Sequence, residues 1–350
     1  MVKLNLTLVF CALLATPARA QYSVCATVPE LGDLAKQVGG DRIHVTTFGK
    51  GAEDPHFVVP RPTFIRDLAR ADALVLVGLQ LEIGWLPPLL RNSRNRAIQI
   101  RGPAYIDASR AVTPMLVPKG RISRSQGDVH PGGNPHFLVS PIHGLKVARL
   151  IKSRFSQLWP DDAEYFEKRF QNFSQRFAQL YLGEKLANKY RDTQLDKLTL
   201  LNSFGRMDQY LESQGELSQL EGWLGMLRPF RGTALVDDHQ MWPYFAHTLG
   251  FKMLGHLEPQ PGMQPTPRHL ATVIQLIRTK GVKVILANAY YDPRHARFVE
   301  ANTNATVAKM AHQVQARPNT ETFLKMCDYN VHELVRLLRL TAPQIAQPMP

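Results

Sequence analysis

The sequence predicts an α/β fold of two parallel-sheet lobes joined by one long connecting helix. Short apolar or β-branched runs alternate with helix-like segments in both halves of the chain, and a long amphipathic segment separates the halves. Strands that alternate with helices in this way form parallel sheets covered by helices. The chain has 350 residues, too many for one compact core and suited to two domains.

The two halves show the alternation separately. In the first half, strands are predicted at 23–28, 42–48 and 73–78, with helices at 31–38 and 64–70. The run 73–78 is apolar throughout, as expected of a strand buried on both faces. In the second half, strands are predicted at 233–236, 252–257 and 282–287, with helices at 240–249, 269–279 and 322–340.

The segment from Asp161 to Tyr190 lies between these blocks and contains no proline. Its aromatic residues recur at helical spacing, and one helix of this length would span roughly 40 Å. We therefore predict a connecting helix at 161–190 between an N-terminal lobe at 21–160 and a C-terminal lobe at 191–340. Residues 341–350 contain three prolines and predict a flexible tail.

Residues 1–20 have the pattern of a signal peptide. Lys3 precedes an apolar stretch, and the small residues at 18 and 20 predict cleavage before Gln21. The apolar stretch is shorter than the roughly 20 residues that cross a bilayer. Phe10 precedes Cys11 where lipidation would require a small residue. We therefore predict a periplasmic protein that is secreted through a cleaved signal peptide and is not lipidated.

Charge and cysteine content exclude some classes of protein. The net charge of +13 falls to +11 when Lys3 and Arg19 are removed, because the segment 1–20 has no acidic residue. The basic residues are scattered through predicted helices, which favours a solvated surface over a nucleic-acid site. Cys25 and Cys327 remain after cleavage, form no CxxC pair, and are predicted to be two buried thiols.

Two of the twelve histidines belong to similar units, Asx-Pro-His-Phe, at 54–57 and 134–137. Proline restricts its own backbone and that of the preceding residue, and an Asx side chain can hydrogen-bond the local backbone. His56 and His136 are therefore predicted to project from stiffened loops. The adjacent Phe57 and Phe137 are expected to anchor these loops to the core.

A third histidine, His239, lies where a predicted strand ends and a helix begins, a common position for ligand-binding residues in α/β proteins. Asp237 or Asp238 could accept the second ring N–H of His239 and fix its tautomer; alternatively, Asp238 only caps the helix. Three neutral imidazoles suit Zn²⁺, whereas Mn²⁺ prefers more oxygen ligands. Zinc usually takes a fourth ligand, so a carboxylate is expected to complete the site.

With these motifs, nearly the whole sequence after residue 20 resembles the zinc- and manganese-binding receptors of ABC importers, the cluster A-I solute-binding proteins. The resemblance rests on the order and spacing of segments at 51–56, 71–78, 133–137, 238–239, 244–245, 249–251, 257–259, 321–323 and 329–330. It implies two lobes with the metal held between them. It also implies delivery of Zn²⁺, with Mn²⁺ less favoured, to a membrane permease by a monomeric receptor that is not an enzyme.

The resemblance also implies a ligand set. His56 and His136 match ligands of the N-terminal lobe, His239 matches the third ligand, and Glu321 falls where many members place an aspartate. Many zinc receptors carry a histidine-rich loop before the second ligand, whereas residues 118–133 contain only His130. Little additional zinc is therefore expected to bind there. The aromatic residues of segment 288–292 also depart from the family pattern.

Two other functions are compatible with the histidines. A zinc hydrolase could bind the metal through His56, His136 and His239 and use Glu321 as general base. No HExxH motif is present, and the predicted ligands come from both lobes. An exported adhesin, or a receptor for another solute, would use the histidines only structurally.

Overall fold

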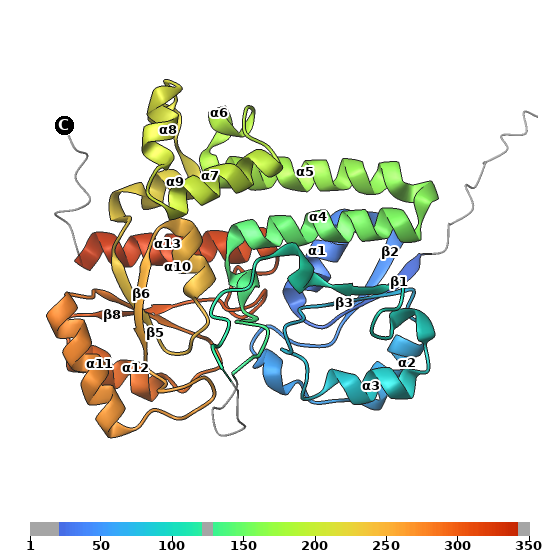
Figure 1. The fold of residues 1–350 in the computed structure, drawn as a ribbon, viewed down its shortest axis with the longest axis horizontal. Coiled ribbons are helices and arrows are strands. Elements are labelled where there is room, and N and C mark those ends of the chain that lie inside the picture. The colour runs from blue at the N-terminus through green and yellow to red at the C-terminus, as the bar shows by residue number, and fades with distance from the viewer. Residues whose placement is uncertain (1–20, 121–128, 342–350) are drawn as a thin grey trace, which may run out of the picture.

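A computed structural model describes residues 21–120 and 129–341. The predicted signal peptide and the tail beyond Thr341 lie outside the described residues. Two four-stranded sheets, both entirely parallel, form the centres of two lobes, in the orders β2-β1-β3-β4 and β6-β5-β7-β8 (Figure 1). The prediction of two parallel-sheet lobes is therefore confirmed.

The first lobe contains strands β1 to β4 and the helices that flank them. The strands are β1 (Tyr22–Ala26), β2 (Ile43–Thr47), β3 (Ala73–Leu76) and β4 (Tyr105–Asp107). The helices are α1 (Pro29–Gly39), α2 (Pro62–Arg70), α3 (Leu86–Ser93) and α4 (Pro141–Leu158). All four residues of β3 are buried, as the apolar run predicts.

The second lobe contains strands β5 to β8. The strands are β5 (Ala234–Asp237), β6 (Lys252–His256), β7 (Val284–Ala287) and β8 (Thr306–Lys309). The helices around them are α10 (Pro243–Leu249), α11 (Pro267–Lys280), α12 (Pro293–Ala301) and α13 (Phe323–Thr341). The sequence prediction missed β4 and β8, which are short edge strands of three and four residues.

The predicted continuous helix at 161–190 is wrong at its C-terminal end. Helix α5 runs from Ala163 to Leu182, and the short helix α6 (Glu184–Ala187) follows. Gly183 separates them with φ of +87°, and a Cβ at this position would lie 2.5 Å from Glu221 Cβ. Glycine therefore suits this close approach and ends the helix.

Helices α4 and α5 lie side by side along one edge of the molecule, and α13 continues this layer over the second lobe (Figure 1). Phe166, Phe170, Phe173 and Phe177 of α5 are buried, which confirms its aromatic core face. The short helices α7 (Thr193–Ser203), α8 (Met207–Ser213) and α9 (Gly222–Leu227) lead into the second sheet. This shared layer joins the two lobes over much of their length.

Buried carboxyl groups organise the carboxyl ends of both sheets. Glu82 accepts hydrogen bonds from Thr27 Oγ1 at 2.7 Å and from the Val77 and Gly78 N–H groups at 2.7 and 3.2 Å, which links the ends of β1 and β3. In the second sheet, Asp238 bonds Asn288 beyond β7. Ligands of open parallel sheets bind beside such ends.

Both cysteines of the described residues are confirmed as buried free thiols. Burial raises the pKa of Cys25 to about 12, so this thiol stays protonated. Among the described helices, none is both long and apolar enough to span a bilayer.

Candidate metal site

The first predicted loop holds His56 by its neighbour Asp54. Asp54 Oδ1 accepts a hydrogen bond from the His56 backbone N–H at 2.9 Å and lies 2.8 Å from His56 Nδ1. With Nδ1 held in this way, Nε2 carries the free lone pair of the neutral ring. Trp85 Nε1 donates to Pro55 O at 3.1 Å and anchors the loop. The expected anchor Phe57 is wrong, because its side chain is 67% exposed.

The second loop is stiffened in the same manner and also contacts the other lobe. Asn134 Oδ1 accepts a hydrogen bond from the His136 N–H at 2.8 Å. Asn134 Nδ2 donates to Gln240 O at 2.6 Å, and Tyr244 Oη donates to Asn134 O at 2.8 Å. Here the predicted anchor Phe137 is fully buried. The loop that carries His136 is therefore tied to residues just after β5.

The third histidine, His239, follows β5, and its ring is positioned by two residues that the sequence reading did not select. Its Nδ1 lies 2.8 Å from Glu258 Oε2 and 2.9 Å from Tyr291 Oη. The Tyr291 ring stacks on the imidazole with centroids 5.4 Å apart. Tyr291 belongs to the aromatic segment 288–292, which thus acquires a physical role beside His239.

The predicted acceptors for the His239 ring are wrong. Asp238 Oδ1 accepts from the backbone N–H of His239 at 2.8 Å, and its other bonds go to Asn288. Asp237 instead pairs with His256 Nδ1. Side chains that alternate along a strand end point to opposite sides, so adjacent aspartates need not reach the ring of the next residue.

His56, His136 and His239 lie together at the junction of the lobes. Their ring centroids are 5.1 Å apart for His56 and His136, 5.2 Å for His136 and His239, and 6.2 Å for His56 and His239. A fourth ring joins them, because His130 Nε2 is 3.2 Å from His56 Nε2. The expectation that His130 stands alone is therefore wrong. Part of its loop, 121–128, lies outside the described residues.

The four rings are gathered but not yet arranged around one point. Nε2 of His239 lies 3.3 Å from Nε2 of His136, and the other short contact joins His130 and His56. In residues 21–120 and 129–341, no group of three or more His, Cys, Asp or Glu side chains has the geometry of a bound metal ion. Ring rotations would be needed for a common ligand.

Electrostatics favour neutral imidazoles in this cluster. Burial, followed by the neighbouring His56 and His239, lowers the pKa of His136 well below its usual range. The same causes lower the pKa of His130 to about 4, although a hydrogen bond with the Leu79 backbone acts in the opposite direction. Neutral rings have the lone pairs that a metal ion requires.

The fourth predicted ligand, Glu321, is not brought to the cluster. Its side chain is 53% exposed and forms an ion pair with Lys325 Nζ at 3.0 Å, one turn further along α13. It lines a separate surface groove with Asp33 and Arg169. Because Glu321 lies just before the first turn of α13, its side chain is held by a local i,i+4 partner instead of reaching the histidines.

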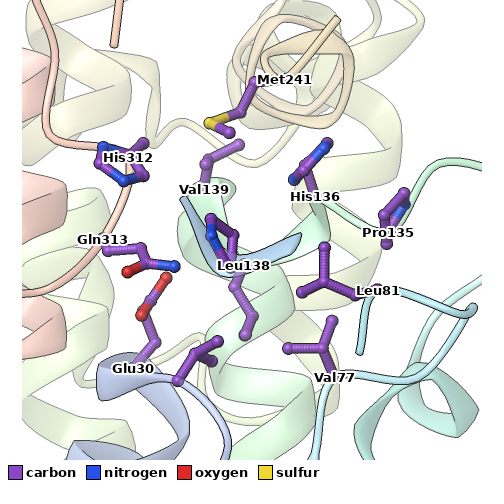
Figure 2. Close-up of a pocket in the computed structure, with 12 residues that line it drawn as sticks. Glu30, Val77, Leu81, Pro135, His136, Leu138, Val139, Met241, His312 and Gln313 are labelled. Carbon is purple, nitrogen blue, oxygen red and sulfur yellow. The ribbon is translucent and has the colours of Figure 1, made fainter. Parts of the chain in front are cut away.

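A small cavity of about 20 Å³ lies behind His136 and is lined also by Glu30, His312 and Gln313 (Figure 2). His312 is buried, and its Nε2 lies 3.2 Å from Glu53 O. The expectation that His312 is an isolated histidine is therefore wrong. Burial lowers the pKa of His312 to about 4 and raises that of Glu30 to about 8, so both side chains are neutral at pH 7.

A further buried imidazole, His143 at the start of α4, predicts a loss of stability in acid. Burial lowers its pKa to about 3, so the unfolded chain takes up a proton first as pH falls below about 6.5. This one group should cost about 2 kcal/mol of unfolding free energy at pH 5 relative to neutral pH. Thermal melts of the chelator-stripped protein at both pH values should show the decrease.

His143→Gln is the matched variant for this prediction, because glutamine is polar but does not titrate. Its stability should fall less between neutral pH and pH 5 than that of the parent protein. Equal decreases in the two proteins would contradict the assignment. Comparing them removes the contributions of other titrating groups, such as Glu30.

Two parallel-sheet lobes that meet at a cluster of histidines define the class of extracytoplasmic substrate-binding receptors of ABC importers that bind metal ions. The sequence profile of the family described as "Zinc-uptake complex component A periplasmic" (ZnuA) matches residues 24–199 and 207–337. The chain belongs to this family. The family consists of solute-binding receptors.

Curated relatives carry names of metal-ion receptors. The manganese ABC transporter substrate-binding lipoprotein PsaA of Streptococcus pneumoniae serotype 4 is 21% identical over 325 residues, which cover 91% of this chain and 90% of PsaA. The metal ABC transporter substrate-binding lipoprotein ScbA of Streptococcus cristatus is 20% identical over 321 residues, or 90% of this chain and 88% of ScbA.

Solved structures share the fold. A crystal structure of ZnuA has a TM-score of 0.63 at 16% identity and covers 91% of this chain and 99% of its own. The Mn-bound periplasmic metal-binding protein of Candidatus Liberibacter asiaticus has a TM-score of 0.63 at 18% identity and covers 90% and 99% of the two chains. At these identities the likeness shows the fold alone.

Proposed function

We propose that this protein binds one Zn²⁺ ion through His56, His136 and His239 and delivers it, as a periplasmic monomer, to the membrane permease of an ABC importer. The observation that carries the proposal is the clustering of these three rings where the lobes meet. His56 and His239 each have Nδ1 held by a carboxylate, which leaves Nε2 for a metal.

The donor atoms favour zinc over manganese. Imidazole nitrogen suits Zn²⁺, whereas Mn²⁺ prefers carboxylate, carbonyl and water oxygen. The two carboxylates beside the cluster, Asp54 and Glu258, are engaged with Nδ1 atoms, and Glu321 lies elsewhere. The names of PsaA and of the Mn-bound Liberibacter protein refer to manganese, and another related structure is a zinc-bound ZnuA variant. Donor chemistry is therefore the basis of our choice.

Elemental analysis of protein purified from the periplasm without chelator tests the proposal. We expect close to one equivalent of zinc per chain, and competition with Mn²⁺ should leave zinc bound. Tightly bound manganese, or several tightly bound zinc ions, would contradict the proposed ligand set. A parallel assay for peptidase and esterase turnover should detect none, since the proposed role is that of a receptor and not of a hydrolase.

Secretion without a lipid anchor is a separate part of the proposal. Phe10 precedes Cys11 in the sequence, although the curated relatives PsaA and ScbA are named lipoproteins. Mass spectrometry of the mature protein should find an unmodified N-terminus near Gln21. A lipid-modified Cys11 would overturn this part while leaving the metal proposal intact.

Zinc binding should close the lobes only slightly. Direct bonds already join them: Phe323 N donates to Asp33 Oδ2 at 2.8 Å, and Ser140 Oγ lies 2.8 Å from Thr248 Oγ1. The helical layer of α4, α5 and α13 connects the lobes along one edge. Small-angle scattering with and without zinc should therefore give nearly equal radii of gyration.

Magnesium is the control ion for this measurement, because it favours oxygen ligands and should not bind the imidazoles. A marked compaction that occurs with zinc but not with magnesium would contradict the stiff connection. Such a result would place a flexible hinge between Gly183 and β5.

A further inference from the structure

His130 lies against the metal site although it comes from a loop that the sequence does not mark as a ligand loop. Its ring stacks on that of His56, with centroids 5.3 Å apart and planes inclined by 28°. A turn closed by the Gly133 N–H bond to His130 O at 3.1 Å shapes this part of the chain. Gly133 has φ of +104°, and a Cβ there would lie 2.9 Å from Met115 O. Glycine thus allows the turn that brings His130 inward.

The Nε2 atoms form two short pairs that match edges of a zinc coordination tetrahedron. With Zn–N bonds of about 2.0–2.1 Å, two tetrahedral ligands lie about 3.3–3.4 Å apart. The His130–His56 separation is 3.2 Å, and the His136–His239 separation is 3.3 Å. These pairs share no residue, so they correspond to two opposite edges of one tetrahedron. Small ring rotations would bring all four atoms to one centre.

The surroundings of His130 prepare its Nε2 for binding. A hydrogen bond with the backbone of Leu79 involves its ring, which leaves the nitrogen that faces His56 for a ligand. His130 also lines a small cavity of about 30 Å³ together with His136 and His239. Three residues of the cluster therefore share one space, and His56 closes it from the far side of His130.

We infer that His130 is the fourth zinc ligand, so that the site is a tetrahedron of four imidazoles without a carboxylate. This inference rests on the proposed function. It assigns to His130 the place that the family resemblance assigns to Glu321. A closed four-coordinate site leaves no open position for a reactive water, in keeping with a receptor. Four nitrogen donors also increase the preference for zinc over manganese.

Titration of the chelator-stripped protein with Zn²⁺ and with Co²⁺ tests the inference. We expect His130→Ala to weaken zinc binding by roughly 10–100-fold or more, since even outer partners of a metal commonly contribute that much. Its Co²⁺ complex should lose the intense visible absorption of a four-nitrogen tetrahedron, because water replaces the imidazole. His130→Asp should bind zinc more weakly than the parent while gaining affinity for manganese relative to zinc.

The controls separate this inference from the proposed function. His44→Ala changes an exposed histidine of β2 and should bind zinc like the parent protein. If the parent binds zinc and His56→Ala does not, while His130→Ala keeps both the affinity and the Co²⁺ spectrum, then only the role of His130 is wrong. If the parent protein itself fails to bind zinc, the proposed function is wrong. Unchanged thermal melts of His130→Ala would show that any lost affinity reflects a lost ligand.

Discussion

Replacing His136 by alanine should weaken zinc binding by more than roughly 100-fold, beyond the range typical of outer-shell partners of a metal. His136 is the central ring of the cluster, since its centroid is within 5.2 Å of those of both His56 and His239. Its side chain is only 8% exposed, so a water that replaced it would be poorly accommodated. His56→Ala and His239→Ala should cause losses of the same order.

Competition with a chromophoric zinc chelator measures these losses. Glu321→Ala is the informative comparison, because this exposed side chain pairs with Lys325 and should leave zinc affinity unchanged. His44→Ala is the matched histidine control, whereas His312 is unsuitable because it lines a cavity with His136. Near-parental affinity in all three histidine variants, or a large loss in Glu321→Ala, would show that the site is misassigned.

The fold could be predicted from the sequence because its signals are local. The apolar runs at 73–78 and 282–287 became β3 and β7, whose residues are buried on both faces of their sheets. Edge strands such as β4 lack this signal, since only one residue of β4 is buried. The end of α5 depended on Gly183 approaching Glu221, a contact that no local pattern reveals.

The candidate site could be predicted in part. Asx-Pro-His units mark stiff loops, and the structure brings His56 and His136 together with His239. The partners of the rings depend on tertiary contacts: Glu258 is 19 positions from His239, and Tyr291 is 52 positions away. His130 had only one signal, its place four positions before Asn134 in a loop that contains Gly132 and Gly133.

Glu321 was misplaced for a related reason. Its prediction came from the family pattern, in which an acidic residue occurs late in the chain. The late segment that actually reaches the junction of the lobes is the stretch just after β8, where His312 is buried against Tyr290 with ring centroids 4.6 Å apart. An alignment by residue type selected an acid, whereas the topology brings a histidine there.

Asp238→Ala should cause a large loss of stability among substitutions outside the cluster itself. Asp238 is 5% exposed and accepts three hydrogen bonds: from His239 N at 2.8 Å, Asn288 N at 2.7 Å and Asn288 Nδ2 at 2.8 Å. Alanine would leave these donors buried without an acceptor. Each such donor costs about 1–3 kcal/mol, so the unfolding free energy should fall by about 3–6 kcal/mol after partial relaxation.

Chemical denaturation of the chelator-stripped protein measures this loss without a contribution from zinc. Asp238→Asn should lie between the parent and the alanine variant, because one oxygen can still accept the two bonds made by Oδ1, while the amide group faces the Asn288 N–H. Asp161→Ala, at an exposed position before α5, should change stability by no more than about 0.5 kcal/mol. If Asp238→Ala were as stable as Asp161→Ala, the carboxyl group would not hold the ends of β5 and β7 together. Because Asp238 also fixes the backbone of His239, the folded alanine variant should bind zinc more weakly than the parent, and the asparagine variant should recover part of that affinity.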